Sequence, residues 1–141
     1  MAAIEPIVVP GSAAPAGHYS AGVRHGDMVY VSGQLGVRPD GTHTADQPFE
    51  DQVRTALDNV LRVLAAACLG PADVVKVTAY IVGVENWPRF NVIYAEVMGA
   101  AKPARAVVPV PELHYGYLIE LEAIAACRED ASENRAAGAR A

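Results

Sequence analysis

The chain has 141 residues and a formal net charge of −5, and 52% of its residues are hydrophobic. A chain of this length typically forms one domain, and an acidic balance without any lysine or arginine cluster argues against a nucleic-acid partner. The sequence shows no signal-peptide pattern and no apolar run near the ~20 residues that span a membrane. Its two cysteines, Cys68 and Cys127, have no metal-ligand or CxxC spacing, which predicts reduced thiols in a cytoplasmic protein without a metal site.

The first part of the chain predicts an extended arm followed by a β-hairpin. Residues 1–16 are rich in proline, alanine and glycine, which favours an arm over a packed element. Two strand-like runs then flank Gly26, which can supply the positive φ of a tight turn. The second run covers residues 28–34 and alternates apolar and polar side chains, as a half-buried strand does.

The middle of the chain predicts two helices separated by a strand. Residues 49–68 place apolar side chains on one stripe at the 3.6-residue spacing of a helix. Residues 73–83 are rich in β-branched side chains and predict a strand. A second helix is expected over residues 87–98, and Gly99 ends it.

Two further strands, at residues 105–110 and 117–126, complete the predicted elements. The resulting order, β-β-α-β-α-β-β, predicts an α+β fold in which two helices cover one face of a mixed sheet. We expect one domain over residues 1–126 and a disordered tail over residues 127–141. A sheet with one uncovered apolar face needs a partner, so we also expect an oligomer.

Charged side chains inside apolar strands are the main candidates for chemistry. Arg105 begins an apolar, β-branched run and should have an anionic partner, because an unpaired buried charge is costly. The partner is either a carboxylate of the protein or that of a ligand, which a planar guanidinium can clamp. Glu120 and Glu122 share one face of a predicted strand. They could form structural ion pairs, lie on a solvated edge, or include a general acid–base.

Weaker candidates surround these charges. Ser32 precedes Gly33 in a strand, where a structural hydroxyl is more typical than a nucleophile, since the chain has no GxSxG elbow. The four histidines have no metal-ligand spacing, and no phosphate-binding glycine motif occurs.

Several segments together resemble one family. They are "HYSAGVRHGDMVYVSGQLG", "QVRTALDNVLRVLAAACLGPADVVKVTAYI", "FNVIYAEV", "KPARAVV" and "LIELEAIA". Over about residues 15–126 the chain resembles the RidA family, also called YjgF, of enamine/imine deaminases. The resemblance implies a chorismate-mutase-like domain in a homotrimer whose sheets face inward and whose sites lie between subunits. It also implies a small carboxylate substrate and no metal or organic cofactor.

The resemblance assigns roles to residues at the matching motif positions. Arg105, in "PAR", corresponds to the arginine that grips the substrate carboxylate, and Glu120, in "IELEAIA", to the acid that orients or activates water. Asn91, in "FNVIY", corresponds to an asparagine for which we expect a structural role. The predicted substrate-binding positions besides Arg105 are Tyr19, Ser32, Gly33, Val107 and Tyr117.

Two departures from the family pattern concern the substrate. Val107 stands where many active members carry cysteine, and "ELHYGY", with His114 and Tyr115, replaces a common "RLPKG"-like stretch. Three hypotheses follow. The chain is a 2-iminobutanoate/2-iminopropanoate deaminase-like hydrolase that converts 2-aminoacrylate-type imino acids to 2-keto acids and ammonia, a deaminase of one pathway substrate such as 2-aminomuconate, or a non-enzymatic metabolite-binding sensor trimer. Arg105 together with Glu120 favours an enzyme.

Overall fold

The computed structural model describes residues 2–128, so most of the predicted tail, residues 129–141, lies outside the described part of the chain. Six strands are present: β1 (Ile4–Ile7), β2 (Gly22–His25), β3 (Met28–Gln34), β4 (Val74–Ile81), β5 (Ala104–Pro109) and β6 (Ile119–Ala126). The helices are α1 (Phe49–Ala66) and α2 (Trp87–Met98), with the short 3-10 turns η1 (Pro71–Asp73), η2 (Val84–Asn86) and η3 (His114–Gly116).

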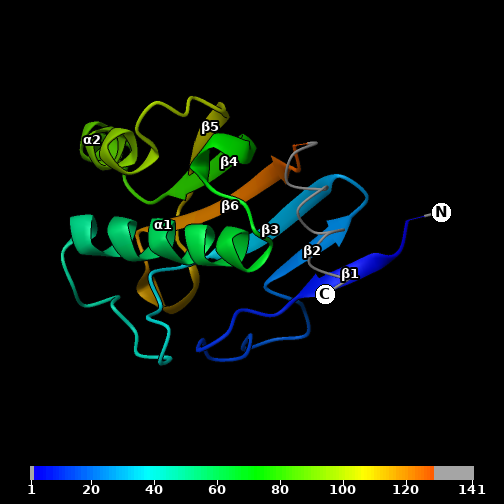
Figure 1. The fold of residues 1–141 in the computed structure, drawn as a ribbon. Helices are drawn as coiled ribbons and strands as arrows, with labels where there is room; N and C mark the ends of the chain where they lie inside the picture. The colour runs from blue at the N-terminus through cyan, green and yellow to red at the C-terminus, as the bar shows by residue number, and fades with distance from the viewer. Residues whose placement is uncertain (1, 129–141) are drawn as a thin grey trace.

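The strands form one mixed sheet in the order β1-β2-β3-β6-β4-β5. The β4–β5 pair is parallel and every other pair is antiparallel. Figure 1 shows α1 lying along this sheet, with α2 beside β4 and β5. The predicted α+β fold with a mixed sheet and two helices is therefore confirmed.

The helices cover one face of the sheet and form the core with it. α1 starts at Phe49 with Glu50 and Asp51 in its first turn, where acidic side chains favour the helix dipole. The buried side chains of α1 and α2 form one core with the alternate sheet residues that are almost fully buried. These are Val29 and Val31 of β3, Val77, Ala79 and Ile81 of β4, and Ile119, Leu121, Ala123 and Ala125 of β6.

The other face of the sheet carries no helix among the described residues. Tyr30 of β3 is 45% exposed and Val108 of β5 is 36% exposed on this face. Glu120 and Glu122 lie on it in β6, between the buried residues of the alternating pattern. No helix within residues 2–128 is long and apolar enough to cross a membrane.

The N-terminal region adds a strand to the predicted element order. β1 lies inside the stretch predicted as an extended arm and pairs with β2, Ile4 opposite His25 and Ile7 opposite Gly22. Four residues that include Pro6 give only a weak strand pattern, and proline is tolerated there because β1 is an edge strand. The predicted turn between β2 and β3 is present, with Gly26 at φ 60°.

Candidate active site

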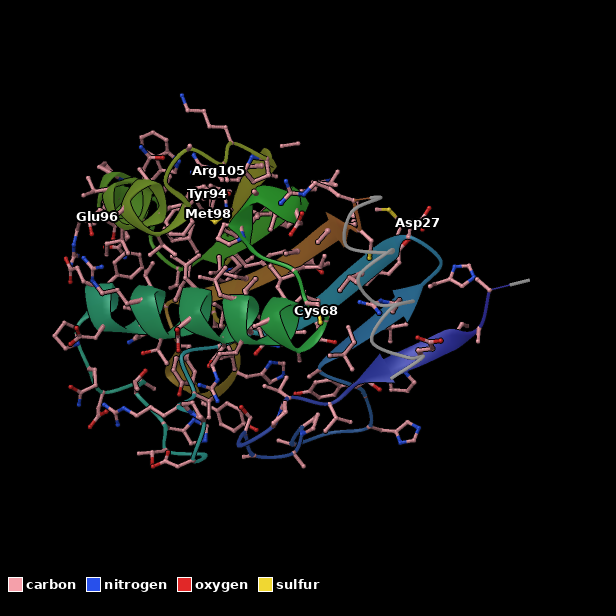
Figure 2. All side chains as sticks on the ribbon, in the orientation of Figure 1. Asp27, Cys68, Tyr94, Glu96, Met98 and Arg105 are labelled. Carbon is pink, nitrogen blue, oxygen red and sulfur yellow. The ribbon has the colours of Figure 1, made fainter. Side chains whose placement is uncertain are left out.

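Arg105 is held on the helix side of β5. Its Nη1 donates a hydrogen bond to Asn91 Oδ1 over 3.0 Å, and its guanidinium lies 4.8 Å from the Tyr94 ring centre and 5.6 Å from that of Phe90. Figure 2 shows Arg105 next to Tyr94 beside α2. Asn91 therefore has the structural contact expected of it, because it orients the guanidinium.

Arg105 has no carboxylate partner within residues 2–128. The ion pairs of this part of the chain join Arg54 to Glu96, Arg89 to Glu50 and Arg128 to Asp73. The alternative of a structural pair between Arg105 and Glu120 or Glu122 is thus not formed. A half-buried cation held by an amide and two rings still has guanidinium donors for an anion.

The Tyr94 hydroxyl is a second unsatisfied group next to this cation. It is buried, and no hydrogen-bond partner for it occurs among the described residues. Burial raises the pKa of Tyr94, and the positive charge of Arg105 acts in the opposite direction. The neighbourhood of Arg105 therefore contains a cation without a carboxylate partner and a hydroxyl without a hydrogen-bond partner among the described residues.

The two glutamates of β6 point to the same face, as predicted, but their surroundings differ. Glu122 Oε1 accepts a hydrogen bond of 2.5 Å from the Tyr80 hydroxyl, and this bond raises the pKa of Tyr80. Glu120 accepts no hydrogen bond from the residues that the structure describes. Burial raises the pKa of Glu120, the charge of His114 lowers it, and that of Glu122 raises it further. Glu120 is the carboxylate that is free to bind a water or a substrate.

Gly33 makes room for the Glu120 carboxylate. The β3–β6 register is irregular between Val31 and Gln34, at the place where Ser32 and Gly33 stand. A Cβ atom on Gly33 would lie 2.8 Å from Glu120 Oε1 and 3.1 Å from its Cδ. The carboxylate thus rests against bare backbone, an approach that only glycine permits without movement.

A hollow of about 510 Å³ opens beside Glu120. We call it the Glu120 hollow; its lining residues are Tyr80, Glu112, Leu113, His114 and Glu120. Tyr80 stands opposite Glu120 in the β4–β6 pairing, so the floor of the hollow is the uncovered sheet face. Its wall is the segment from Glu112 to His114, where η3 begins.

Aromatic packing fixes the wall of the Glu120 hollow. Tyr115 has φ 61°, an uncommon backbone conformation for a non-glycine residue, and Gly116 follows with φ 78°. The Tyr115 ring lies 4.8 Å from the ring of His43 and 6.5 Å, edge-on, from that of Tyr117. These contacts hold the turn that carries His114.

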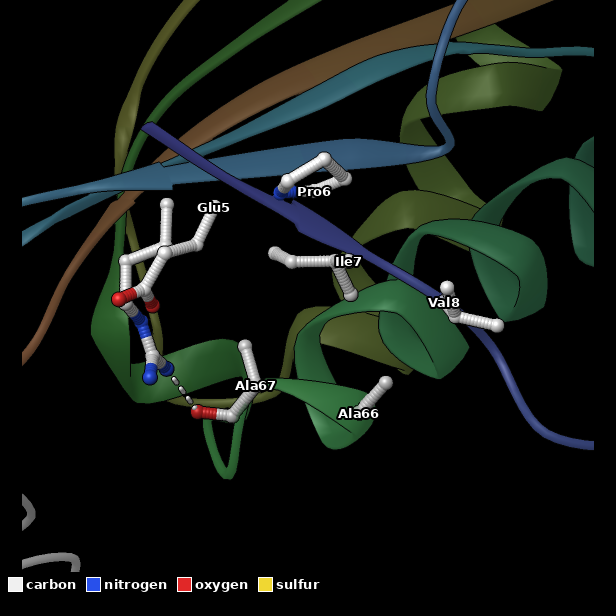
Figure 3. A pocket seen from close by; sticks show the side chains of 7 residues that line it. Glu5, Pro6, Ile7, Val8, Ala66 and Ala67 are labelled. Carbon is white, nitrogen blue, oxygen red and sulfur yellow. Dashed lines mark hydrogen bonds between the residues drawn. The ribbon is translucent and has the colours of Figure 1, made fainter. Parts of the chain in front are cut away.

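A second, smaller hollow lies elsewhere, between β1 and the end of α1 (Figure 3). It measures about 170 Å³ and contains no residue of the predicted site. Its Arg24 donates from Nη2 to the Ala67 carbonyl over 2.7 Å. This contact satisfies a carbonyl at the end of α1, which is a structural role.

Proteins of known structure and sequence share this architecture. A family model described as endoribonuclease L-PSP matches residues 11–127. A RutC family protein of Pyrococcus horikoshii is 36% identical over 121 residues, covering 86% of this chain and 96% of that protein.

The chain belongs to this family, which is the RidA (YjgF) family that its motifs resemble.

Two further members extend this relation to a named activity and a bound ligand. A protein of Dermatophagoides farinae named 2-iminobutanoate/2-iminopropanoate deaminase is 33% identical over 118 residues, covering 84% of this chain and 92% of that protein. The crystal structure of Escherichia coli TdcF with bound serine is 31% identical with a TM-score of 0.81, covering 88% of this chain and 99% of that one.

Arg105 and Glu120, the two catalytic residues that the RidA resemblance predicts, face opposite sides of the sheet in one chain. Arg105 is paired with Val77, whose side chain is buried under the helices. Glu120 is paired with Tyr80 and lies on the uncovered face. A single RidA-like subunit therefore does not bring its own arginine and glutamate to one point.

The other predicted binding residues fall into two groups. Gly33 lies against Glu120, and Ser32 is its neighbour, but the Ser32 hydroxyl donates to the Ser20 carbonyl over 2.6 Å. Tyr19 is 55% exposed, and Val107 packs at the edge of the core on the Arg105 side of β5. The structure thus brings Gly33 to Glu120 and Val107 to Arg105.

Tyr117 requires a correction. Its side chain is only 1% exposed, its hydroxyl accepts the Thr44 N–H over 3.0 Å, and His43 Nδ1 lies 2.9 Å from the same oxygen. Tyr117 is therefore an internal anchor rather than a substrate contact. Tyr117 lies two residues before Ile119, so the alternation of the predicted strand places both on the buried face, and this was the sequence signal for its burial.

Tyr80 and Glu112 are the site residues that sequence reasoning missed. Tyr80 reaches the Glu120 hollow only through the pairing of β4 with β6, which the sequence does not state. Glu112 comes from an irregular segment without periodicity. No local pattern marks either residue.

Proposed function

We propose that this chain is a hydrolytic deaminase of reactive enamine and imine intermediates. It converts 2-aminoacrylate-type 2-imino acids to 2-keto acids and ammonia. The observation that carries this proposal is Arg105, a half-buried guanidinium that Asn91 orients and that has no carboxylate partner within residues 2–128. Such a group suits bidentate binding of a substrate carboxylate.

The site proposed for this reaction is shared by two chains. Arg105 and Glu120 face opposite sides of one sheet, and the face that carries Glu120 lacks a covering layer. In a homotrimer with inward-facing sheets, Arg105 of one subunit meets Glu120 and Gly33 of the next. Tyr19 and Val107 complete the cleft in this proposal. The Ser32 hydroxyl donates its proton to the Ser20 carbonyl, but its oxygen can still accept a hydrogen bond from a substrate.

The reaction needs only modest catalysis, because the imine carbon is itself an electrophile that reacts with water. Arg105 binds the carboxylate and fixes the C=N carbon next to a water that Glu120 orients. The substrate reacts as the protonated imine, C=NH2+. The water oxygen bonds to its carbon while Glu120 takes one water proton, giving a neutral carbinolamine. Glu120 returns this proton to the amino nitrogen, the C–N bond breaks to release ammonia, and the hydroxyl passes its proton to Glu120 as the ketone forms. No step needs a metal or an organic cofactor.

The family comparisons support the same reaction class. One relative is named 2-iminobutanoate/2-iminopropanoate deaminase, and a TdcF structure contains serine, a small amino acid with a carboxylate. A net charge of −5 gives no support for the ribonuclease in the family description. Cys68 and Cys127 are both free thiols, which fits the cytoplasm as the proposed place of action.

The test is the hydrolysis of 2-iminopropanoate that an amino-acid oxidase generates from alanine in the same cuvette. We expect Arg105→Ala to lose at least about a hundredfold in kcat/KM, because both carboxylate binding and orientation disappear. A sizing column establishes that the variant keeps the assembly of the parent protein. Wild-type turnover in the variant would refute the proposal.

Arg54→Ala is the matched control. Arg54 is an exposed arginine on α1 that pairs with Glu96 over 2.8 Å. Surface pairs of this kind contribute at most about 1 kcal/mol to stability. We expect this variant to keep full activity, so a loss in both variants would point to a general effect of arginine removal.

A further inference from the structure

The Glu120 hollow has more polar groups than the proposed hydrolysis uses. The reaction requires Glu120, yet two other polar residues line the same hollow: Glu112, just before η3, and His114, the first residue of η3. Leu113 adds a half-buried apolar side chain between them. The volume of about 510 Å³ leaves space beyond the reacting carbon and its water.

We infer that Glu112 determines side-chain specificity and excludes 2-imino acids that carry a second carboxylate. This inference rests on the proposed function, because it concerns the substrate of the same site. A substrate whose carboxylate lies on the partner's Arg105 and whose C=N carbon lies at Glu120 directs its side chain along the remaining wall. Small neutral side chains contact Leu113 there, and a second anion would face Glu112.

The charge of the hollow supports this selection. The hollow is lined by two carboxylates, Glu112 and Glu120, and by one imidazole, that of His114. One imidazole carries at most one positive charge, so it cannot neutralise both carboxylates. Glu122 adds a third carboxylate on the same sheet face, bonded to Tyr80 at the floor of the hollow. Selection against a ligand is achieved by placing like charge against it. No arginine or lysine lines this hollow among the described residues, so a second substrate carboxylate finds no counterion.

The experiment compares two imino acids that differ by one carboxylate. An oxidase generates 2-iminopropanoate from alanine, and another generates 2-iminosuccinate from aspartate. We expect wild-type kcat/KM to be about tenfold higher for 2-iminopropanoate, the order of discrimination that one like-charge contact gives in a partly exposed site. Glu112→Lys should erase or reverse this ratio, and Glu112→Gln should reduce it.

Asp58→Lys is the matched control. Asp58 is exposed on α1, which covers the opposite face of the sheet, and the substitution changes net charge by the same amount. We expect its substrate ratio to equal that of the wild type. Unchanged ratios in both Glu112 variants, with 2-iminopropanoate still hydrolysed, would overturn the inference and leave the proposed function standing. Failure of the wild type to hydrolyse either imine would refute the proposed function, and the inference with it.

Discussion

Gly33→Ala tests whether the position of the Glu120 carboxylate matters for activity. The added Cβ would lie 2.8 Å from Glu120 Oε1, whereas ordinary contact begins at 3.4 Å, so the carboxylate must move by about 0.6 Å. The far end of a glutamate side chain can make this movement at little cost. Gly33 has no positive φ, and alanine also lowers the entropy of the unfolded chain. We therefore expect the free energy of unfolding to change by less than about 1 kcal/mol.

Activity should respond much more than stability. A misplacement of 1 Å can cost about a hundredfold in rate, so a shift of roughly half that distance predicts a kcat lower by about tenfold. The assay is the hydrolysis of freshly generated 2-iminopropanoate, with chemical denaturation run in parallel. KM should change little, since Arg105, the proposed carboxylate-binding residue, is untouched.

Gly70→Ala is the control for this substitution. Gly70 has φ −141°, an extended conformation open to any residue, and no atom would lie within 4 Å of the added Cβ. This variant should retain wild-type kcat. If Gly33→Ala also retained it, the carboxylate of Glu120 would not be the group that acts on water, and its place beside Gly33 would be a packing detail.

Two further predictions concern the surroundings of the site. Glu122→Gln removes a negative charge that raises the pKa of Glu120. Glu120 then ionises at lower pH, so the acid limb of the kcat/KM profile should move to lower pH. A shift of this limb to higher pH would contradict the proposed role of Glu120 as the base. Tyr117→Phe leaves the buried Thr44 N–H without its acceptor and should cost about 1–3 kcal/mol of stability in a denaturant titration, while kcat/KM at a temperature well below unfolding stays at the wild-type value. Loss of turnover in a stable, folded Tyr117→Phe protein would return this residue to the site.

Periodicity was sufficient to predict the main elements, because each has a strong local pattern. The stripe of α1 and the alternation of β6 reflect which side chains face the core, and the structure buries those same residues. The four residues of β1 are too few for such a pattern. Their strand is created by pairing with β2 along the sheet edge.

The candidate site was predictable only in its parts. The anomalous charges of Arg105 and Glu120 stand out in the sequence because each interrupts an apolar run. That they face opposite sides of the sheet depends on the pairing of Arg105 with Val77 and of Glu120 with Tyr80. These pairings join residues far apart in the chain, and no local propensity encodes them.

Mixed assemblies test the proposed shared site directly. Arg105→Ala subunits retain Glu120, and Glu120→Gln subunits retain Arg105. If each site draws these two residues from neighbouring subunits, random mixing of the inactive variants restores about one quarter of the sites in a ring assembly. If one chain supplies both residues, mixing restores none. Because Arg105 and Glu120 lie on opposite faces of the sheet in one chain, we expect that mixing restores activity.

The measurement requires that the subunits truly exchange. The two variants carry different affinity tags and are unfolded and refolded together, and material that binds both resins in turn is assayed for imine hydrolysis. Variants mixed after separate refolding contain the same chains without exchange and should remain inactive. Doubly tagged assemblies with no activity would show that the arginine and the glutamate do not act in a site between subunits, because every other requirement for turnover is then met.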